Sequence, residues 1–378
     1  MQNSRRNFLK AAALVPAIYA LKPGELLAAA DCAGKGAIPK AISFDECQSM
    51  DPVKCAESSP MVQDAWKYLH AEHDGIKNPA LRGLIKDTYA DPAPALASRL
   101  DEKSRQAVWE ELSAKGYTKD GQADFLPSTG SGKFSFLAAP GSGYQSHHAY
   151  PGGLCTHTAT NVRITANIAD TYREVFGYCV NRDIAVAAQF LHDLHKPWVF
   201  QWQADFSSRT EKPLAATGQH HPLSVAELLV RKAPAELAVA QACAHTHPGT
   251  PEDEAQVVNW LTAAAIIAGV DPVAYGLLEK GGKTLPLPRR QEGFLCHLGD
   301  HDFVLSVPAV QWTLPVMTEI AMADYRLSEA DAKGKPFNAL RNAVYSRVSA
   351  MRLHDAYAKE GKAGVRGLML ATVTPPKA

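Results

Sequence analysis

The chain has 378 residues, of which 46% are hydrophobic and 21% are charged, a composition that excludes a disordered or fibrous protein. The 39 Lys and Arg residues balance 39 Asp and Glu residues, which argues against a general nucleic-acid-binding protein, because such proteins carry a basic excess. Fourteen histidines are more than packing alone requires, and they are the compositional feature to be explained.

The first thirty residues are predicted to form an export signal. Arg5 and Arg6 are a twin-arginine pair, followed by an apolar run over residues 11–21 and a small-residue cleavage site near residue 30. This order resembles the bacterial Tat signal peptide. We therefore expect recognition by the Tat export machinery and a periplasmic or secreted protein. We expect no stable membrane span after cleavage, because the apolar run is shorter than the roughly 20 residues that a bilayer requires.

Cleavage would change the charge balance. Residues 1–30 contain four basic residues and one acidic residue, so the mature chain has 35 basic and 38 acidic residues and a net charge of −3. Three cysteines, Cys32, Cys47 and Cys55, follow the signal closely, and one disulfide among them is expected in an oxidising compartment. The sequence does not choose the pair. The chain lacks CxxC and CxxCH motifs, which disfavours thiolate zinc and c-type haem.

Helices dominate the predicted elements. An acidic start and a following Gly116 delimit a helix over residues 101–115, and helical apolar spacing continues through the central part of the chain. The best strand signal is short, Phe134–Leu137, and strands do not alternate with helices, so we predict an all-α fold. The further predicted helices are residues 153–172, 182–195, 222–232, 234–246 and 253–270.

Two breaks rich in Gly and Pro, at residues 126–143 and 280–290, suggest the domain organisation. After the signal peptide at residues 1–30, we expect three regions. These are an N-terminal helical region at 31–125, a metal-binding domain at 126–280 and a C-terminal helical region at 290–378.

Imidazole and carboxylate side chains recur on the apolar segments between residues 144 and 271. A buried carboxylate such as Asp193, which follows His192 at the end of an apolar helix, is costly unless it is paired or bound to a cation. Helical bundles build internal metal sites from such inward-facing donors. For Asp271, which precedes Pro272, capping of the next helix is an alternative role. The segments carry, in order, His147, His148 and His157; His192, Asp193 and His195; His220 and His221; His245 and His247; and Asp271.

This order resembles the HD-domain superfamily of helical, metal-dependent phosphohydrolases. The most specific pieces are residues 147–158, HHAYPGGLCTHT, and residues 191–196, LHDLHK. The first is similar to an HHAYxGGLxxHT form found in bacterial HD proteins, including 3′–5′ exoribonucleases. The resemblance covers about residues 140–275. It implies an HD-domain helical bundle with flanking helical regions and a ligand set of His157, His192, Asp193, His221, His245 and Asp271.

Three positions depart from the family pattern. His195 stands where the family usually has glycine. The family's adjacent histidine pair is split into His245 and His247, so His247 is an alternative ligand. Pro272 directly follows Asp271, and Asp324 is the alternative if that proline misdirects the carboxylate.

The resemblance implies hydrolysis of a phosphate ester by water that two divalent metal ions activate, with Asp193 bridging the ions. Iron or manganese is expected ahead of zinc, magnesium, nickel or cobalt. Lys196 and one of His147, His148 or His195 would neutralise charge that develops on the phosphate. The mature charge favours a small phosphoester or nucleotide over a long polyanion.

The same four histidines and two aspartates would also serve a different reaction. HD-type di-iron oxygenases such as myo-inositol oxygenase use this arrangement to activate O2, so an oxygenase is the alternative function. A folded but inactive metal-binding module is a third interpretation.

Overall fold

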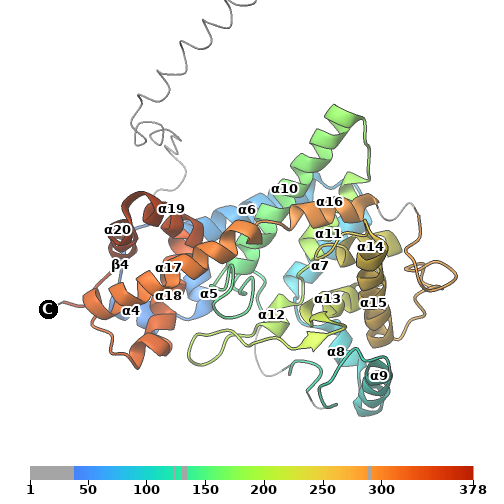
Figure 1. The fold of residues 1–378 in the computed structure, drawn as a ribbon, viewed down its shortest axis with the longest axis horizontal. Coiled ribbons are helices and arrows are strands. Elements are labelled where there is room, and N and C mark those ends of the chain that lie inside the picture. Colours follow the sequence, from blue (N-terminus) through green and yellow to red (C-terminus); the bar gives the residue numbers. More distant parts are fainter. Residues whose placement is uncertain (1–37, 123, 130–133, 288–290, 378) are drawn as a thin grey trace, which may run out of the picture. The chain divides into compact units, whose positions relative to one another are not determined.

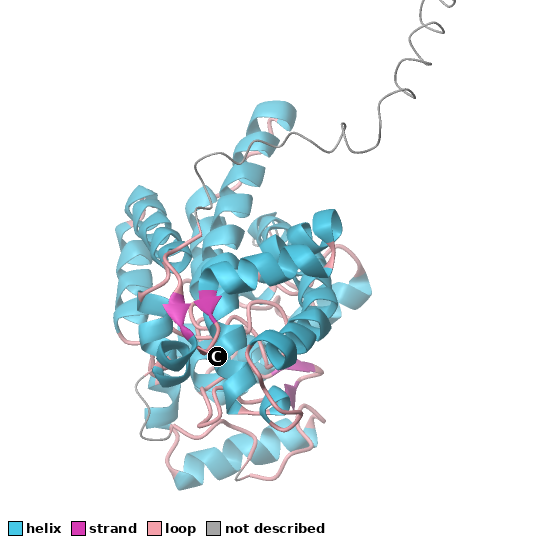
Figure 2. Cartoon of the chain, turned by 90° about the vertical axis from the view of Figure 1, so that its left-hand side faces the viewer, coloured by secondary structure: helices cyan, strands magenta, loops and turns pink. Residues whose placement is uncertain are grey.

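The computed structural model describes the chain outside residues 1–37, 123, 130–133, 288–290 and 378. Residues Ile38–Ala378 form one compact unit built almost entirely from helices and turns (Figure 1, Figure 2). The all-α fold class predicted from the sequence is therefore confirmed. The predicted signal peptide and Cys32 lie outside the described residues, whereas Cys47 and Cys55 are buried free thiols.

Helices follow one another along most of the chain. The helices before the central segment are α4 (Phe44–Ser49), α5 (Pro52–Glu57), α6 (Pro60–Gly75), α7 (Pro79–Ala90), α8 (Ala95–Arg99) and α9 (Glu102–Ala114). The central helices are α10 (Gly153–Phe176), α11 (Arg182–Leu191), α12 (Lys196–Val199), α13 (His220–Val230), α14 (Ala235–Ala242) and α15 (Pro251–Ala268). The last helices are α16 (Gln291–Gly299), α17 (Phe303–Asp324), the 3-10 turn η1 (Asp331–Lys333), α18 (Lys335–Val348), α19 (Ala350–Glu360) and α20 (Lys362–Thr372).

Two short strand pairs complete the described structure. Strand β1 (Ile42–Ser43) pairs in parallel with β4 (Val373–Thr374), which brings the two ends of the compact unit together. Strand β2 (Pro213–Leu214) pairs antiparallel with β3 (Thr217–Gly218), directly before α13.

The histidine-bearing helices are neighbours in space. Helix α10 packs against α6, α11 and α16, and α11 packs against α14 and α16. Helix α13 packs against α14 and α15. A separate apolar cluster joins α17, α18, α19 and α20. The helix ends that carry polar side chains can therefore converge between α10, α11, α13 and α14.

All the helices predicted between residues 101 and 270 are present. Helices α11 and α14 end well before their predicted ends at residues 195 and 246, because the chain leaves the helix at Leu191 and Ala242, just before histidine-bearing segments that turn inward. In the following pairs the predicted range comes first and the observed helix second: 101–115, Glu102–Ala114; 153–172, Gly153–Phe176; 182–195, Arg182–Leu191; 222–232, His220–Val230; 234–246, Ala235–Ala242; and 253–270, Pro251–Ala268.

The short strand signal at Phe134–Leu137 does not correspond to a strand in the structure. These residues form coil and a turn, and they pair with no other strand among the described residues. The apolar side chains of this segment serve packing instead, since Phe136 is buried and stacks on Tyr89 with ring centroids 3.9 Å apart.

A glycine pair determines how the chain enters α10. Gly152 has a φ of 85°, a conformation that side chains disfavour. A Cβ atom on Gly153 would lie 1.7 Å from the carbonyl oxygen of His148, so that position admits only glycine. The two glycines thus allow the loop before α10 to fold tightly against its first turn.

One helical stretch among the described residues, Gln291–Asp324, is long and apolar enough by composition to cross a membrane. It comprises α16 and α17, which are separated by the segment 300–302. Core helices of globular proteins meet the same criterion, and Asp300, between the two helices, is buried.

A buried carboxylate, Glu227, joins α13 to α8. It accepts hydrogen bonds from the backbone N–H groups of Ala95 and Leu96, at 3.0 and 2.9 Å, and from Arg231 at 2.7 Å. His195 Nε2 lies 3.3 Å from the Oε2 atom of Glu227. Burial raises the pKa of Glu227, but these partners outweigh burial and lower the pKa to about 2.

We predict that Glu227→Gln lowers the free energy of unfolding by about 3 kcal/mol at neutral pH, since it leaves buried cationic and N–H partners poorly satisfied. The folded-state pKa lies below the ordinary value of 4.5, so the stabilisation is fully present above pH 4.5 and is lost as the pH falls through about 2. Urea unfolding from pH 7 to pH 2 measures this. The exposed control Glu57→Gln should change stability by less than about 0.5 kcal/mol; an equal effect of both variants would contradict the role of Glu227.

Candidate metal centre

A buried carboxylate, Asp193, lies where helix ends from four parts of the chain meet. Its Oδ2 atom is 3.2 Å from Nε2 of His157 and 3.0 Å from Nε2 of His192. Its Oδ1 atom is 3.5 Å from Nε2 of His220 and 3.8 Å from Nε2 of His245. The two oxygens thus face two different pairs of histidines, an arrangement in which a carboxylate could contact two cations at once.

A second buried carboxylate, Asp300, closes the centre from the segment between α16 and α17. Its Oδ1 atom is 3.2 Å from His157 Nε2 and 3.5 Å from His192 Nε2, and its Oδ2 atom is 3.5 Å from His245 Nε2. Three overlapping groups have ligand atoms within 4.8 Å of one another: His157, His192 and Asp300; His192, Asp193 and His245; and His220, His221 and His245.

Local structure aims each ring at the centre. His192 follows the last residue of α11, and its Nδ1–H donates to the carbonyl of Gln189 at 2.8 Å, which leaves Nε2 for the centre. His220 Nδ1 contacts Glu211 at 2.6 Å, and His221 Nδ1 contacts Thr217 at 2.6 Å. Metal-binding histidines commonly have such partners on the other ring nitrogen, because these fix the tautomer and the ring orientation.

His221 and His245 stack on each other, with ring centroids 3.2 Å apart. The structure therefore brings His221 to the centre together with its neighbour His220, and His220 contacts Asp193 directly. The ligand set implied by the sequence contains His221 and leaves out His220, whereas the structure offers both.

Opposite charges stabilise one another in this buried space. Burial raises the pKa of Asp193 and of Asp300, but the nearby His192 and the other cationic partners outweigh burial and hold both values well below the ordinary range. Burial lowers the pKa of His192, but the two carboxylates outweigh it and raise the pKa to about 9. The carboxylates likewise raise the pKa of His157 against the effect of burial, so the two rings nearest Asp193 Oδ2 favour the protonated form.

The donor set fits divalent cations. Asp193 Oδ1 is buried and has no hydrogen-bond partner among the described residues, since its nearest imidazole nitrogen, His220 Nε2, is 3.5 Å away. Such atoms are costly to bury unless a partner satisfies them. Imidazole and carboxylate donors without thiolate suit iron, manganese, zinc and related ions, which would displace the imidazole protons on binding.

Lys196 enters the centre from the first turn of α12. Its side chain is buried, and Nζ lies 2.5 Å from Asp193 Oδ2 and donates a hydrogen bond to the carbonyl of Gly141. The expected proximity of Lys196 to the metal ligands is therefore present.

Two predicted residues are not brought to the centre. Asp271 is exposed, and its carboxylate accepts a 2.6 Å hydrogen bond from the N–H of Ala274, so it caps the following turn. Its alternative, Asp324, forms an ion pair with Arg366 at 2.8 Å. Asp300 takes the position expected for the last carboxylate, because α16 packs on α10 and α11 whereas Asp271 follows the far end of α15.

The other histidines predicted to act in the site lie in different surroundings. His195 is buried and belongs to none of the metal groups; its ring lies beside Glu227 and edge-on to Trp198, and its predicted catalytic role stays a prediction. The side chain of His247 is 41% exposed and joins none of these groups, and His245 is the member of that pair that does. His148 belongs to a neighbouring group that also contains Asp302.

Asp300 was missed although the sequence carries a signal for it. Residues 297–302, HLGDHD, form the last turn of α16 and the segment after it, and they contain two histidines and two aspartates. Histidine and aspartate are combined here at a helix end as in His192 and Asp193, but these residues lie outside the range 140–275 that resembles the HD-domain superfamily.

A curated protein of known activity matches part of the chain. The chain is 34% identical over 118 residues to the dihydroneopterin 2′,3′-cyclic phosphate phosphodiesterase of Methanocaldococcus jannaschii. The match covers 30% of this chain and 47% of that protein, so the chain spans about half the length of its relative. No protein-family model matches the chain, and no solved structure matches it.

We predict that Asp300→Asn lowers the metal content of the purified protein by at least half, since it removes a carboxylate shared by three histidines. Asp271→Asn is the matched control and should retain the wild-type content, because its carboxylate only caps a turn. Elemental analysis of both variants measures this. Metal loss in Asp271→Asn with retention in Asp300→Asn would restore the ligand set expected from the sequence.

Proposed function

We propose that this protein is a metal-dependent phosphohydrolase that cleaves a small phosphodiester. The observation that carries the proposal is the buried Asp193, whose two oxygens face two histidine pairs and whose neighbour Lys196 supplies a positive charge. The phosphodiesterase activity named for the relative supports this reaction over O2 activation. A cyclic phosphodiester is the first substrate class to test.

The described residues would hold two cations. His157 and His192 face one carboxylate oxygen of Asp193, and Asp300 lies beside both rings. His220 and His245 face the other oxygen, and His221 forms a group with these two histidines. When bound, such a pair of ions lowers the pKa of a water molecule and stabilises charge on phosphoryl oxygens.

The protein side chains would prepare the site for an anionic substrate. Lys196 holds a positive charge beside Asp193, where it can neutralise charge that develops on a phosphoryl oxygen. Glu211 and the Gln189 carbonyl hold the His220 and His192 rings in fixed orientations. Because these groups are set before substrate binds, little reorganisation is needed during the reaction.

We predict that the purified protein hydrolyses 2′,3′-cyclic phosphodiesters, and that Asp193→Asn lowers kcat/KM by at least about 1000-fold because the shared carboxylate is lost. Asp271→Asn should retain wild-type activity. A panel of cyclic, linear and monoester phosphates, assayed for product together with an oxygen electrode, measures this. O2 consumption without phosphoester cleavage would instead indicate the oxygenase alternative.

Membership of the HD-domain superfamily and export by the Tat route form a second part of the proposal. Both rest on sequence resemblance, the first on residues 147–158 and 191–196 and the second on Arg5 and Arg6 with the apolar run behind them.

We predict that the double variant Arg5→Lys, Arg6→Lys accumulates unprocessed in the cytoplasm of a Tat-competent bacterium, whereas the wild-type chain appears in the periplasm shortened by about 30 residues. Cell fractionation and intact-mass measurement test this. Lys10→Arg, which leaves the arginine pair intact, is the control. Equal export of all three chains would contradict Tat recognition.

A further inference from the structure

A pocket with aromatic walls lies between α6, α7 and the end of α11. It encloses about 190 Å³, and none of the residues in the metal-binding groups lines it. We refer to it as the aromatic pocket. Its lining includes Trp66, Leu69 and His70 of α6, Ile85 and Tyr89 of α7, and Phe190 of α11.

Helical spacing brings these side chains to one place. Trp66 and His70 are four residues apart and share a face of α6, and Ile85 and Tyr89 share a face of α7 in the same way. Helix α7 packs against both α6 and α11, so Phe190 reaches the pocket from α11. Three helices thus contribute to a single apolar recess.

Aromatic rings form much of the wall. Trp66 and Tyr89 stack with an interplanar angle of 13° and ring centroids 5.8 Å apart. Phe190 lies 6.0 Å from Tyr89, and His70 stands edge-on to Trp66 at 4.8 Å. Aromatic rings in contact gain stability beyond their buried area, so these walls favour a planar ring over an aliphatic group of similar size.

The edge of the pocket carries an exposed positive charge. Lys86 lines the pocket and forms no ion pair among the described residues. His73 also lines it, but its Nδ1 atom lies 3.1 Å from Asp74 and its Nε2 atom 2.9 Å from the carbonyl of Arg82. No acidic side chain is part of the described lining. The charge at the edge therefore favours a ligand with an anionic substituent.

The volume limits the size of the ligand. An engineered apolar cavity of about 150 Å³ binds benzene. The aromatic pocket, at about 190 Å³, therefore suits one ring with a short substituent and is too small for a nucleotide.

We propose that the aromatic pocket binds a small planar aromatic carboxylate. Its ring packs against Trp66, Tyr89 and Phe190, and its carboxylate lies beside Lys86. The ligand contacts the helix that leads to the metal centre, since the Tyr89 hydroxyl donates a 2.7 Å hydrogen bond to the carbonyl of Phe190, three residues before Asp193. The aromatic pocket is a binding site separate from the proposed hydrolysis, and its test requires neither metal nor turnover.

The test uses benzoate as the probe and the purified full chain as the receptor. In a titration followed by saturation-transfer NMR, we expect saturable binding with a Kd of about 1 mM, a value within reach of so small a ligand. Cyclohexanecarboxylate lacks the planar ring and benzyl alcohol lacks the charge, so each should bind at least about threefold more weakly. Binding of cyclohexanecarboxylate as tight as that of benzoate would contradict the aromatic ligand class.

Three variants locate the binding. Ala90 lines the pocket and is exposed, so Ala90→Trp fills the space without removing a core side chain and should weaken benzoate binding at least tenfold. Lys86→Gln should weaken benzoate binding about threefold and leave benzyl alcohol binding unchanged. Lys67→Gln removes a lysine of α6 that is 76% exposed and does not line the pocket, and this control should bind benzoate as the wild type does.

A second measurement checks the position of the ligand directly. Crystals soaked with 4-bromobenzoate should show a bromine anomalous peak in the aromatic pocket of the wild type that is missing from Ala90→Trp. An unchanged circular dichroism spectrum of Ala90→Trp shows that the variant is folded. Absence of saturable benzoate binding to the wild type, or equal binding to the wild type and folded Ala90→Trp, would overturn the proposal. Either result leaves the proposed hydrolysis unaffected, because that activity is tested by phosphoester cleavage.

Discussion

The buried charge of Asp193 is the constraint on which the rest of this structure depends. An ionised carboxylate at 1% exposure costs several kcal/mol unless opposite charge surrounds it. The chain meets this cost by ending α11 just before His192, by opening α13 with two histidines and by turning Lys196 inward. Each of these local features would be unfavourable by itself, and they become favourable together around one carboxylate.

The surroundings of the centre fix its histidines before any ligand arrives. The Gln189 carbonyl, Glu211, Thr217 and Asp302 contact the Nδ1 atoms of four different rings. Most of these partners come from elements other than those that carry the rings, so the packing of α10, α11 and α13 and the short β2–β3 hairpin sets the orientation of the imidazoles. A centre held in this way can serve as a preorganised electrostatic site.

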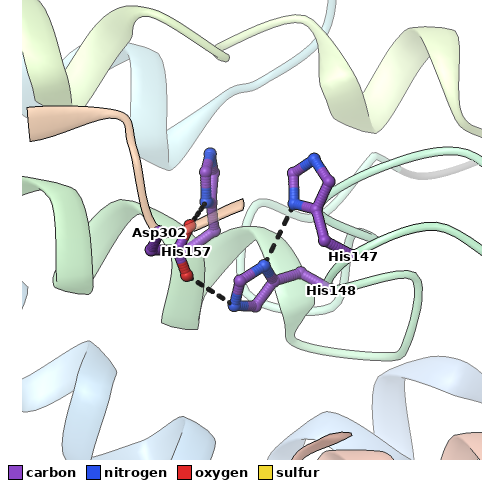
Figure 3. A group of neighbouring side chains, drawn as sticks. All are labelled: His147, His148, His157 and Asp302. Carbon is purple, nitrogen blue, oxygen red and sulfur yellow. Dashed lines mark hydrogen bonds and ion pairs between the residues drawn. The ribbon is translucent and has the colours of Figure 1, made fainter. Parts of the chain in front are cut away.

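The excess of histidines has two structural explanations. Half of the fourteen belong to the four groups of side chains that could hold a metal ion, one of which Figure 3 shows. Others pack against neighbouring side chains. His195 comes three residues after the inward-facing His192, yet it contacts Glu227 and Trp198. Adjacent residues in a turn point in different directions, so the sequence motif at residues 191–196 contains both residues of the candidate centre and a core histidine and does not distinguish them.

The sequence alone determined the helices and the local part of the centre. Apolar spacing and glycine stops predicted α9, α10, α11, α13, α14 and α15, and the short motifs around His157 and His192–Asp193 identified residues that do converge. Only the tertiary structure decided which carboxylate completes the centre. Asp300 lies far beyond Asp193 in the chain and reaches it because α16 packs on α10 and α11, whereas Asp271 is left at an exposed turn. Contacts across such separations depend on how helices pack, and no local periodicity records that choice.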